Sequence, residues 1–528
     1  MRRLLALLFL LDGLVVVGLV RPLRLASHYP GPTWPLFDII GHNYGATLRF
    51  TALVAAMVAL FLLAYRVANG LSGRRATLVV FGGAGLLALT FLLLYPATNH
   101  DLFHYVMEGR ILWVHHNNPF TVAPVSFPND PFYCDAFCRT HYGWYEVNRE
   151  WQWAPSPNLV WEGYPSPYGP AWAVLTGLPL LLGHGDPIWT LISFKLLSVA
   201  FLFLGAVAVF HGVRFLRPGR EWGATVLFAW NPLVLMYVAG NGANDMIMMG
   251  LTLVAVYLAM RQRWNSAFPV LALACLIKFV SAVLIPVFIV YAVITTPREK
   301  WRHLVESLAL SAVIGLVMYA PFWRGKLTFE TLRTQARQFT DSPPALLLRL
   351  LERVTTPTHA EFWTKSFALM LFAAAYAFIL YRLIAGRRRH SADDLPSAAF
   401  AVMCAYLMLS VFWFQPWYLL WLISLGALTV GVRARLTLLF SFTGLLTHTA
   451  TSIAAIKLWY WTDIHPNGMT YEVGLVVSMV FLPPGLYIAC VLLARTEFVK
   501  SLRARRSAVA GRAGPTIGPR GGTPVAEA

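Results

Sequence analysis

Long apolar runs recur along almost the whole chain, from Leu4 to Leu493. A helix of about 20 apolar residues spans the ~30 Å hydrocarbon core of a bilayer. The composition agrees, because 58% of the 528 residues are hydrophobic and 12% are charged, against roughly 45–50% and about 25% in soluble domains. These features predict an all-α, polytopic membrane protein with no large soluble domain.

The net charge of +18 comes from basic residues that gather in short clusters between the apolar runs. Such clusters are typical of cytoplasmic loops, so we expect no nucleic-acid partner. The expected cytoplasmic clusters are Arg2 and Arg3; Arg66, Arg74 and Arg75; Arg214, Arg217 and Arg220; Arg261 and Arg263; Arg298, Lys300 and Arg302; Arg382 with Arg387 to Arg389; Arg433 and Arg435; and the segment 495–506. This pattern predicts a multi-pass cell-membrane protein with both termini in the cytoplasm.

The charge pattern requires about 14 transmembrane helices. They are expected near 3–20, 47–65, 77–95, 190–213, 222–239, 246–260, 265–278, 281–294, 304–322, 363–384, 397–413, 416–431, 436–456 and 472–494. The apolar stretch 171–182 is not counted as a crossing, because counting it would place the basic cluster after residue 213 outside the cell. An interfacial helix is expected at 171–182 instead. The two segments that flank Lys278 leave a single kinked span as an alternative.

This path divides the chain into six regions. They are N-terminal transmembrane helices (1–95), a long extracytoplasmic loop with the candidate catalytic residues and interfacial helices (96–189), central transmembrane helices (190–322), an outer loop (323–362), C-terminal transmembrane helices (363–494) and a basic, disordered cytoplasmic tail (495–528). If this long loop is extracytoplasmic, its oxidising surroundings permit a disulfide between Cys134 and Cys138, a pairing that the sequence leaves open. A metal site with His141 is the weaker alternative.

Four ionisable residues, His100, Asp101, His104 and Glu108, open the long loop. On a helix, Asp101, His104 and Glu108 share one face. A partly desolvated carboxylate bonded to imidazole is suited to act as a general base toward a sugar hydroxyl. Two alternatives remain: a solvated helix start capped by Asn99, and a divalent metal held by the two histidines with a carboxylate.

The long loop is also rich in aromatic residues, which favours a carbohydrate substrate because flat rings pack on the C–H faces of sugars. An aromatic belt at the membrane interface is the alternative interpretation. The residues concerned are Trp113, Trp144, Tyr145, Trp151, Trp153, Trp161, Tyr164 and Tyr168.

Several separated stretches resemble a known family. They are DLFHYVMEGRILWVHHNNPFTVAP (101–124), SPYGPAWAVL (166–175), NPLVLMYVAGNGANDMIMMGL (231–251), LACLIKFVSAVLIP (272–286) and FQPWYLLWLISLG (414–426). Together they resemble the polyprenol-phosphate-mannose-dependent mannosyltransferases of the GT-C superfamily, and most closely the actinobacterial alpha-1,6-mannopyranosyltransferases. The resemblance implies a GT-C glycosyltransferase-like helical fold, a lipid-linked donor, and Asp101 as the catalytic base at the start of the first large outer loop.

The expected reaction is transfer of a mannosyl residue, with inversion, from polyprenyl-phosphate-mannose to an extracytoplasmic glycan or glycolipid acceptor. No cofactor is expected, with a divalent metal as the alternative. A related transferase that uses another polyprenyl-phosphate sugar, such as glucose or arabinose, is the first rival. A lipid or sugar transporter or flippase is the second, although the chain shows no internal repeat of the kind such proteins often have.

The other candidate residues are expected to bind substrate. His104 or Glu108 would orient Asp101 or bind acceptor hydroxyls. Phosphate-binding candidates are Lys278, which interrupts an apolar run, Arg333 and Arg337, spaced i, i+4 on an expected short helix, and His448. The alternatives are a snorkelling lysine, solvated arginines and a histidine bonded to a neighbouring helix.

The stretch NGAND, which contains Asn241, Asn244 and Asp245, lies where two expected crossings meet at the outer face. A tight turn is one interpretation. The family resemblance places the stretch beside the donor and implies a sugar-side or phosphate-side role. Arg110 is expected to be structural, with a pairing to Glu108 or phosphate as the alternative.

Overall fold

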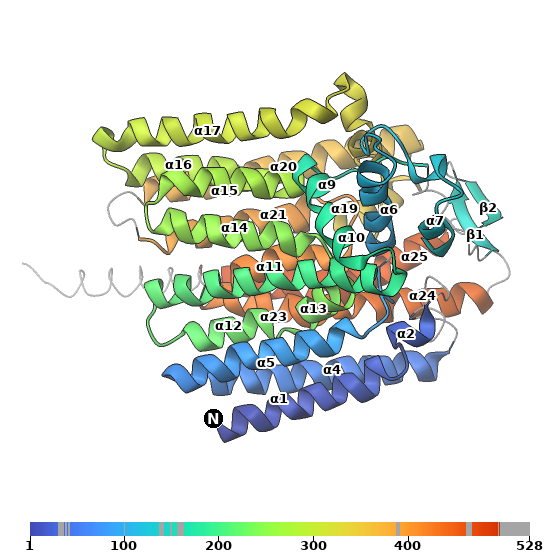
Figure 1. The fold of residues 1–528 in the computed structure, drawn as a ribbon, viewed down its shortest axis with the longest axis horizontal. Helices are drawn as coiled ribbons and strands as arrows, with labels where there is room; N and C mark the ends of the chain where they lie inside the picture. The colour runs from blue at the N-terminus through green and yellow to red at the C-terminus, as the bar shows by residue number, and fades with distance from the viewer. Residues whose placement is uncertain are drawn as a thin grey trace, which may run out of the picture.

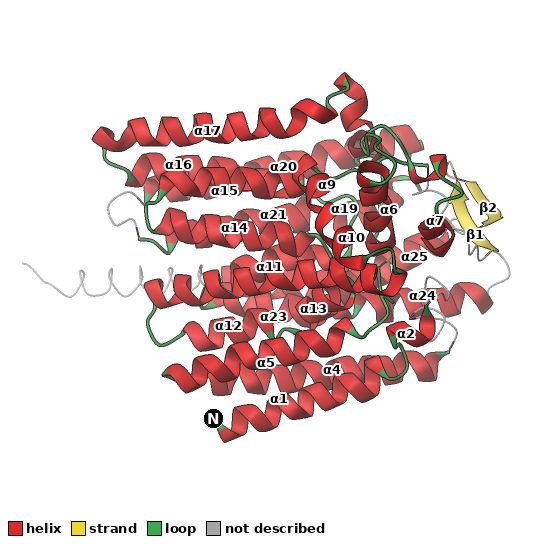
Figure 2. Ribbon diagram, viewed as in Figure 1, coloured by secondary structure: helices red, strands yellow, loops and turns green. Residues whose placement is uncertain are grey.

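The protein is a bundle of helices that lie side by side, with a group of short helices and one hairpin at one end (Figures 1 and 2). The computed structural model describes residues 1–29, 36, 40, 43–99, 101–136, 142–147, 150–155, 163–386, 391–460, 467–494 and 496. Helix α6 (Asp101–Trp113) stands across the long axes of the bundle at that end.

The N-terminal half of the chain forms α1 (Arg2–Val15), η1 (Val16–Val20), α2 (Leu25–His28), α4 (Tyr44–Ala68), α5 (Arg74–Leu92), α6, η2 (Pro124–Ser126), α7 (Pro131–Ala136), β1 (Tyr142–Val147), β2 (Glu150–Pro155), α9 (Pro170–Leu175), α10 (Gly177–Gly183), α11 (Pro187–Leu216), α12 (Glu221–Ala229), α13 (Pro232–Leu235), η3 (Met236–Gly240) and α14 (Asp245–Met260). The C-terminal half forms α15 (Trp264–Ile277), η4 (Phe279–Leu284), α16 (Ile285–Thr295), η5 (Arg298–Lys300), α17 (Trp301–Tyr319), η6 (Ala320–Phe322), η7 (Gly325–Phe329), α18 (Glu330–Gln335), α19 (Pro343–Leu351), α20 (Pro357–Ala385), α21 (Asp394–Leu409), η8 (Pro416–Tyr418), α22 (Leu419–Gly426), α23 (Val432–Leu445), α24 (Thr447–Tyr460), α25 (Asn467–Val476) and η9 (Val477–Phe481).

Eight helical segments among the described residues are long and apolar enough to cross a membrane, and nine if the bent pair Glu221–Ala229 and Pro232–Gly240 counts as one span. The eight are Arg2–Val20, Tyr44–Ala68, Arg74–Leu92, Pro187–Leu216, Arg298–Phe322, Pro357–Ala385, Val432–Lys457 and Thr470–Ala494. The chain is therefore a multi-pass membrane protein by the length and composition of its helices. The predicted total of about 14 spans is higher than these criteria support.

The difference comes from helices that are apolar but short. Each of the other predicted crossings is helical, yet Asp245–Met260, Trp264–Ile277, Phe279–Thr295, Asp394–Leu409 and Pro416–Gly426 have between 10 and 17 residues. Apolar runs in the sequence continue through points where the backbone leaves the helix. Asn231 with Pro232, and Lys278, are two such points, since proline lacks the amide donor that a helix interior requires and Lys278 has an extended backbone.

The chain reverses at Lys278, which separates α15 from η4 and α16. The far ends of these helices meet, because Thr296 after α16 donates a hydrogen bond to Gln262 before α15, with Oγ1 and Oε1 separated by 3.5 Å. The rings of Trp264 and Tyr291 also lie 6.1 Å apart. The segments that flank Lys278 are therefore two adjacent helices, and the alternative of one kinked span is wrong.

The strict all-α prediction needs one correction. Strands β1 and β2 pair as an antiparallel hairpin in which Tyr142 faces Pro155 and Val147 faces Glu150. Aromatic residues and valine are enriched in strands, and this part of the long loop is rich in tryptophan and tyrosine. The signal for the hairpin was therefore present, but the aromatic residues were interpreted only as a sugar platform or a membrane belt.

The expected interfacial helix at 171–182 is helical, as α9 and α10, and the combined stretch Pro170–Gly183 is too short to count among the candidate spans. Leu178, Leu181 and Leu182 are exposed on it. Exposed leucines on a short helix fit a position in the membrane interface, which stays a prediction.

Some predictions concern residues outside the described part of the chain. These residues are His100, Cys138 and His141, the side chain of Cys134, and nearly all of the tail 495–528. The orientation of the termini and the six-region division also stay predictions.

Candidate functional site

Helix α6 begins at Asp101, as the sequence predicts. The Asn99 Oδ1 atom accepts a hydrogen bond from the Asp101 amide at 2.7 Å, so Asn99 satisfies an amide that the helix start would leave unpaired. Asp101 is partly exposed as a residue, and the Tyr105 hydroxyl donates to its Oδ2 atom at 3.4 Å. Asp101 is therefore held at its backbone and contacted at one carboxylate oxygen.

His104 and Glu108 lie on the same face of α6 and are both buried. His104 Nε2 is 3.1 Å from Glu108 Oε1, and Trp172 Nε1 donates to Glu108 Oε2 at 3.0 Å. Both oxygens of Glu108 thus have protein partners. Its partners are His104 and Trp172 and not Asp101, so the two predicted roles of Glu108, orienting Asp101 and binding acceptor hydroxyls, stay predictions.

A second carboxylate, Asp245, is held by residues from two other elements. Lys278 Nζ donates to both Asp245 oxygens at 2.9 Å, and Trp421 Nε1 donates to Oδ1 at 2.6 Å. The Asp245 side chain has no exposed surface, and that of Lys278 is 13% exposed. This is a buried ion pair with extra hydrogen bonding, the condition under which burial of two charges is tolerated.

The Lys278 ammonium also faces three aromatic rings, with centroids at 5.4 Å for Tyr168, 5.3 Å for Tyr418 and 6.0 Å for Trp421. Ring faces attract cations at such distances. The chain around Tyr168 approaches closely because Gly169 has no side chain: a Cβ atom there would lie 2.0 Å from the Leu276 carbonyl oxygen. The sequence analysis selected Tyr168 only as a sugar-packing or membrane-belt aromatic and did not select Trp421, although both lie in stretches that carry the family resemblance.

The pKa of Asp101 depends on its burial and on the charges of Lys278 and Asp245. Burial raises the pKa of Asp101 above its usual value, while the Lys278 ammonium and the hydrogen bond from Asn99 partly offset this effect. The charge of Asp245 adds to the rise. A raised pKa makes Asp101 a stronger base than a solvated aspartate.

His104 is influenced by burial and by its acidic neighbours. Burial alone would lower the pKa of His104, but the charge and hydrogen bond of Glu108, aided by Asp101, outweigh burial and raise it. Burial also raises the pKa of Tyr105 and Tyr168 well above the usual value, so both phenols stay neutral hydrogen-bond donors.

The NGAND stretch connects η3 to α14 beside the start of α6. Gly242 has φ +70°, and a Cβ atom there would lie 2.9 Å from Leu102, so the tight-turn interpretation is confirmed. Asn241 Nδ2 donates to Thr98 Oγ1. Asn244 is completely buried, and neither amide atom of its side chain has a hydrogen-bond partner in the described structure. Since buried polar groups are normally paired, Asn244 remains a candidate ligand-binding residue.

The other predicted phosphate-binding residues lie apart from this cluster. His448 Nε2 is 2.7 Å from the Tyr237 hydroxyl. This contact agrees with the alternative in which His448 bonds to a neighbouring helix. Arg333 pairs with Glu330 at 3.3 Å, and both side chains are more than half exposed. Helix α18 ends at Gln335, so Arg337 lies in the following turn and the expected shared helix face is wrong. No interaction recorded in the described structure joins these residues to Asp101.

Lys195 is a buried lysine that the sequence reasoning did not select. It is fully buried in α11 and donates to the carbonyl oxygens of Leu92, at 3.3 Å, and Leu94. Cations near a helix C-terminus are stabilised by the helix dipole. The signal was a single lysine within the apolar run LISFKLLSV, the same signal that selected Lys278.

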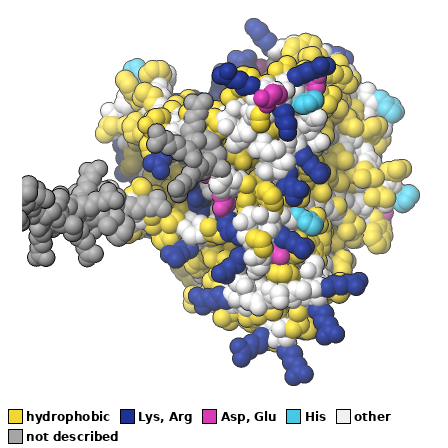
Figure 3. Space-filling model, turned by 90° about the vertical axis from the view of Figure 1, so that its left-hand side faces the viewer, with side chains coloured by type: hydrophobic (Ala, Val, Ile, Leu, Met, Phe, Trp, Pro, Cys, Tyr) yellow, Lys and Arg dark blue, Asp and Glu magenta, His cyan; other side chains and the backbone are white. Residues whose placement is uncertain are grey.

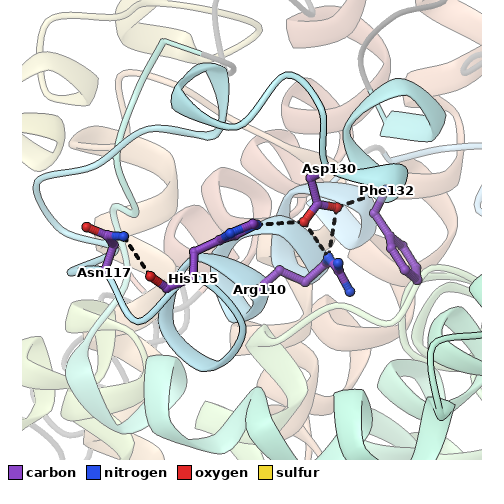
Figure 4. Close-up of polar contacts among 5 residues, drawn as sticks. All are labelled: Arg110, His115, Asn117, Asp130 and Phe132. Carbon is purple, nitrogen blue, oxygen red and sulfur yellow. Dashed lines mark hydrogen bonds and ion pairs between the residues drawn. The ribbon is translucent and has the colours of Figure 1, made fainter.

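The C-terminal end of α6 is fixed by Asp130 (Figure 4). Arg110 Nε donates to the two Asp130 oxygens at 2.8 and 2.9 Å, and the His115 Nε2 atom lies 2.7 Å from Oδ2. The Phe132 amide also donates to Asp130 Oδ1, at 2.9 Å. Arg110 is therefore structural, as predicted, although its partner is Asp130 and not Glu108. This network attaches the long loop to α6.

The described part of the chain contains no set of ligands for the divalent metal that was the alternative interpretation. No three His, Cys, Asp or Glu side chains are grouped there closely enough to hold an ion. His100, which the metal alternative requires, is outside that part.

The helices and this cluster define a multi-pass membrane protein with a buried site of acid, imidazole and ammonium groups at one end of its bundle. The family model described as "Alpha-(1->6)-mannopyranosyltransferase, N-terminal domain" matches residues 10–295, more than half of the chain. The chain belongs to this family and is therefore a mannosyltransferase, which is a class of glycosyltransferase. The matched region contains Asp101, Asp245 and Lys278.

Two relatives agree with this assignment. The chain is 21% identical over 420 residues to alpha-(1->6)-mannopyranosyltransferase A of Mycobacterium tuberculosis, an alignment that covers 75% of this chain and 70% of the relative. It is 26% identical over 204 residues to the protein of the same name from Corynebacterium glutamicum, covering 37% and 35% of the two chains.

Proposed function

We propose that the protein transfers a mannosyl residue from polyprenyl-phosphate-mannose to an extracytoplasmic glycan or glycolipid acceptor, with inversion, and that Asp101 is the general base. The observation that carries this proposal is a connected cluster of side chains. The Tyr105 hydroxyl donates to Asp101 on α6, the Tyr105 and Tyr168 rings lie 5.5 Å apart, and the Lys278 ammonium at the end of α15 lies 5.4 Å from the Tyr168 ring centroid. One site thus offers a base for an acceptor hydroxyl and a cation for a donor phosphate.

Asp101 has the properties of a base for a sugar hydroxyl. It is partly exposed, so an acceptor can reach it, and its pKa is raised by burial. The buried His104 lies on the same helix face as Asp101, and Glu108 favours the protonated form of its imidazole. The proposed task of the His104 charge is to keep Asp101 ionised until the acceptor hydroxyl loses its proton.

Lys278 has the properties of a phosphate-binding residue. Its ammonium group has three N–H donors. Asp245 accepts hydrogen bonds from this group, and the neutral rings of Tyr168 and Tyr418 also face it. Polyprenyl phosphate is a stabilised leaving group because the second pKa of phosphate is about 6. Charge neutralisation by Lys278, without protonation of the phosphate, is then sufficient for its departure.

The chemical step is one displacement. The acceptor oxygen forms a bond to the anomeric carbon as the bond from that carbon to the phosphate oxygen breaks, and the phosphate keeps the electron pair. Asp101 takes the hydroxyl proton. Holding acceptor, anomeric carbon and phosphate in line supplies much of the acceleration, and attack opposite the phosphate inverts the configuration.

The test is the variant Asp101→Asn, which keeps the shape and removes the base. Turnover should fall by about 10²- to 10⁴-fold, the usual contribution of general base catalysis, while binding of polyprenyl-phosphate-mannose stays unchanged. A matched control is Asp186→Asn, because Asp186 caps α11 through a bond from the Trp189 amide and asparagine caps equally well. Near-normal turnover by the Asp101 variant would remove Asp101 from this role.

The same assay separates the rival functions. Supplying polyprenyl-phosphate glucose and arabinose beside the mannosyl donor identifies the sugar, and transfer of another sugar without transfer of mannose would reject the proposed donor. For the transporter or flippase, proteoliposomes that carry Asp101→Asn should show no loss of lipid movement if transport is the real activity.

A further inference from the structure

A recess lies at the end of the bundle opposite to α6. It has a volume of about 730 Å³ and lies between the start of α5, the end of α11 and the start of α12. Figure 3 looks onto this end, where Lys and Arg side chains gather. Neither the family assignment nor the proposed chemistry gives this recess a role.

Lining residues of the recess lie on one face of α5 and one face of α11, and each face has an arginine near the helix end and an apolar residue about two turns deeper. On α5, Arg74, Thr77 and Phe81 are spaced i, i+3 and i+7; on α11, Val207 and Arg214 are seven residues apart, with Phe210 and His211 between them. Residues at these spacings share a face. At 1.5 Å per residue, Phe81 and Val207 lie about 10 Å deeper along the helices than the two arginines.

The recess therefore has a cationic rim and an apolar interior. Arg74 and Arg214 are exposed at the ends of two candidate membrane spans, and no hydrogen bond or ion pair to either is found in the described structure. Val207 is 44% exposed, although it lies within the span and faces the recess.

On the α12 side of the recess, Glu221 and Trp222 already have hydrogen-bond partners. Glu221 Oε2 accepts a bond from the Gly219 amide at 2.7 Å, and Trp222 Nε1 donates to Thr77 Oγ1 at 3.1 Å. The rings of Phe210 and Trp222 lie 5.9 Å apart. These contacts fix the shape of the wall and leave the guanidinium groups as the free binding groups of the rim.

We propose that this recess binds an anionic, two-chain phospholipid. The phosphate would lie between Arg74 and Arg214, and an acyl chain would extend past Phe81 and Val207. Basic pockets between transmembrane helices suit anionic lipid headgroups, and arginine binds phosphate oxygens in a planar, two-donor geometry. The basic tail of the same chain is disfavoured as the occupant because its arginines would repel those of the rim. The distance from Asp101 along the bundle makes this lipid distinct from the donor.

The test measures retention of phosphatidylglycerol by the purified full-length protein, using native mass spectrometry and titration in nanodiscs, with phosphatidylcholine as the uncharged comparison. The double variant Arg74→Gln/Arg214→Gln should weaken phosphatidylglycerol binding about 25-fold, from roughly a factor of 5 for each basic residue near a membrane surface. The matched control is Arg75→Gln/Arg220→Gln, which removes two exposed charges, at the start of α5 and immediately before α12, from positions outside the lining of the recess.

The outcomes distinguish the possible occupants. Equal weakening in both double variants would overturn the proposal, because the charge effect would then be diffuse. Full competition by glycerol phosphate would also overturn it and indicate a soluble anion. A second variant, Val207→Trp, fills the apolar interior and leaves both arginines; it should lower phosphatidylglycerol retention at least several-fold, and unchanged retention would count against an acyl chain in the recess.

Discussion

The buried pair of Asp245 and Lys278 gives a prediction that separates a structural role from a chemical one. In Lys278→Met, the Asp245 carboxylate keeps only the bond from Trp421 and has no exposed surface. Removing one partner of a buried ion pair typically costs about 3–5 kcal/mol. The free energy of unfolding should fall by that amount in a denaturant titration of the purified protein.

The double variant Lys278→Met/Asp245→Asn removes both charges and leaves an amide oxygen that still accepts from Trp421. Because a neutral pair of similar volume is often as stable as a buried ion pair, most of the lost stability should return. If Lys278 binds the donor phosphate, kcat/KM should stay roughly 10- to 150-fold low, since a hydrogen bond to a charged group contributes about 1.5–3 kcal/mol.

Stability and mannosyl transfer are therefore measured on the same three preparations: the native protein, the single variant and the double variant. Recovery of both stability and transfer in the double variant would refute the phosphate role and leave Lys278 a purely structural residue. A loss of less than about 1 kcal/mol in Lys278→Met would refute the reasoning about the buried charge itself.

The remaining predictions concern pH, the long loop and topology. Because Asp101 must be ionised to act and its pKa is raised, kcat/KM for transfer should start to fall at a higher pH than it would with a solvated aspartate as the base. This acid limb of the pH–kcat/KM profile should move to higher pH in Lys278→Met and to lower pH in Asp245→Asn. A limb that does not move in either variant would exclude Asp101 as its source. Asp130→Asn should weaken three contacts to α6 and the loop, costing about 3–5 kcal/mol and speeding proteolysis of the loop, whereas unchanged cleavage would contradict the proposed attachment. Tags in 96–189 should be accessible only from outside the cell, and labelling from the cytoplasm would reverse the topology.

Local patterns in the sequence predicted much of the fold. Every predicted crossing is helical, because a long apolar run in lipid must satisfy its backbone hydrogen bonds within the segment. The start of α6, its capping by Asn99 and the shared face of Asp101 and His104 are also local, since they depend only on residue spacing along one helix. The family resemblance of the stretch that contains Asp101 is carried by the same contiguous residues.

Helix ends and burial were harder to predict. Arg333 and Arg337 have the spacing of one helix face, but α18 ends between them. A solvated helix start was one alternative for this stretch, but Glu108 is buried and bonded to Trp172. In both cases the neighbours in space, and not the neighbours in sequence, decide where the helix stops and which side faces solvent.

The sequence by itself determined that the chain is a helical membrane protein, that an acidic residue begins α6, and that Lys278 interrupts an apolar run. Only the tertiary structure joined Lys278 to Asp245 and Trp421, surrounded the ammonium with rings from Tyr168 and Tyr418, and brought this group near Asp101. The physical reason is that helices form from hydrogen bonds and residue spacing within one segment. The pairing of buried charges depends on which helices pack together, and the spacing within one segment does not determine that packing.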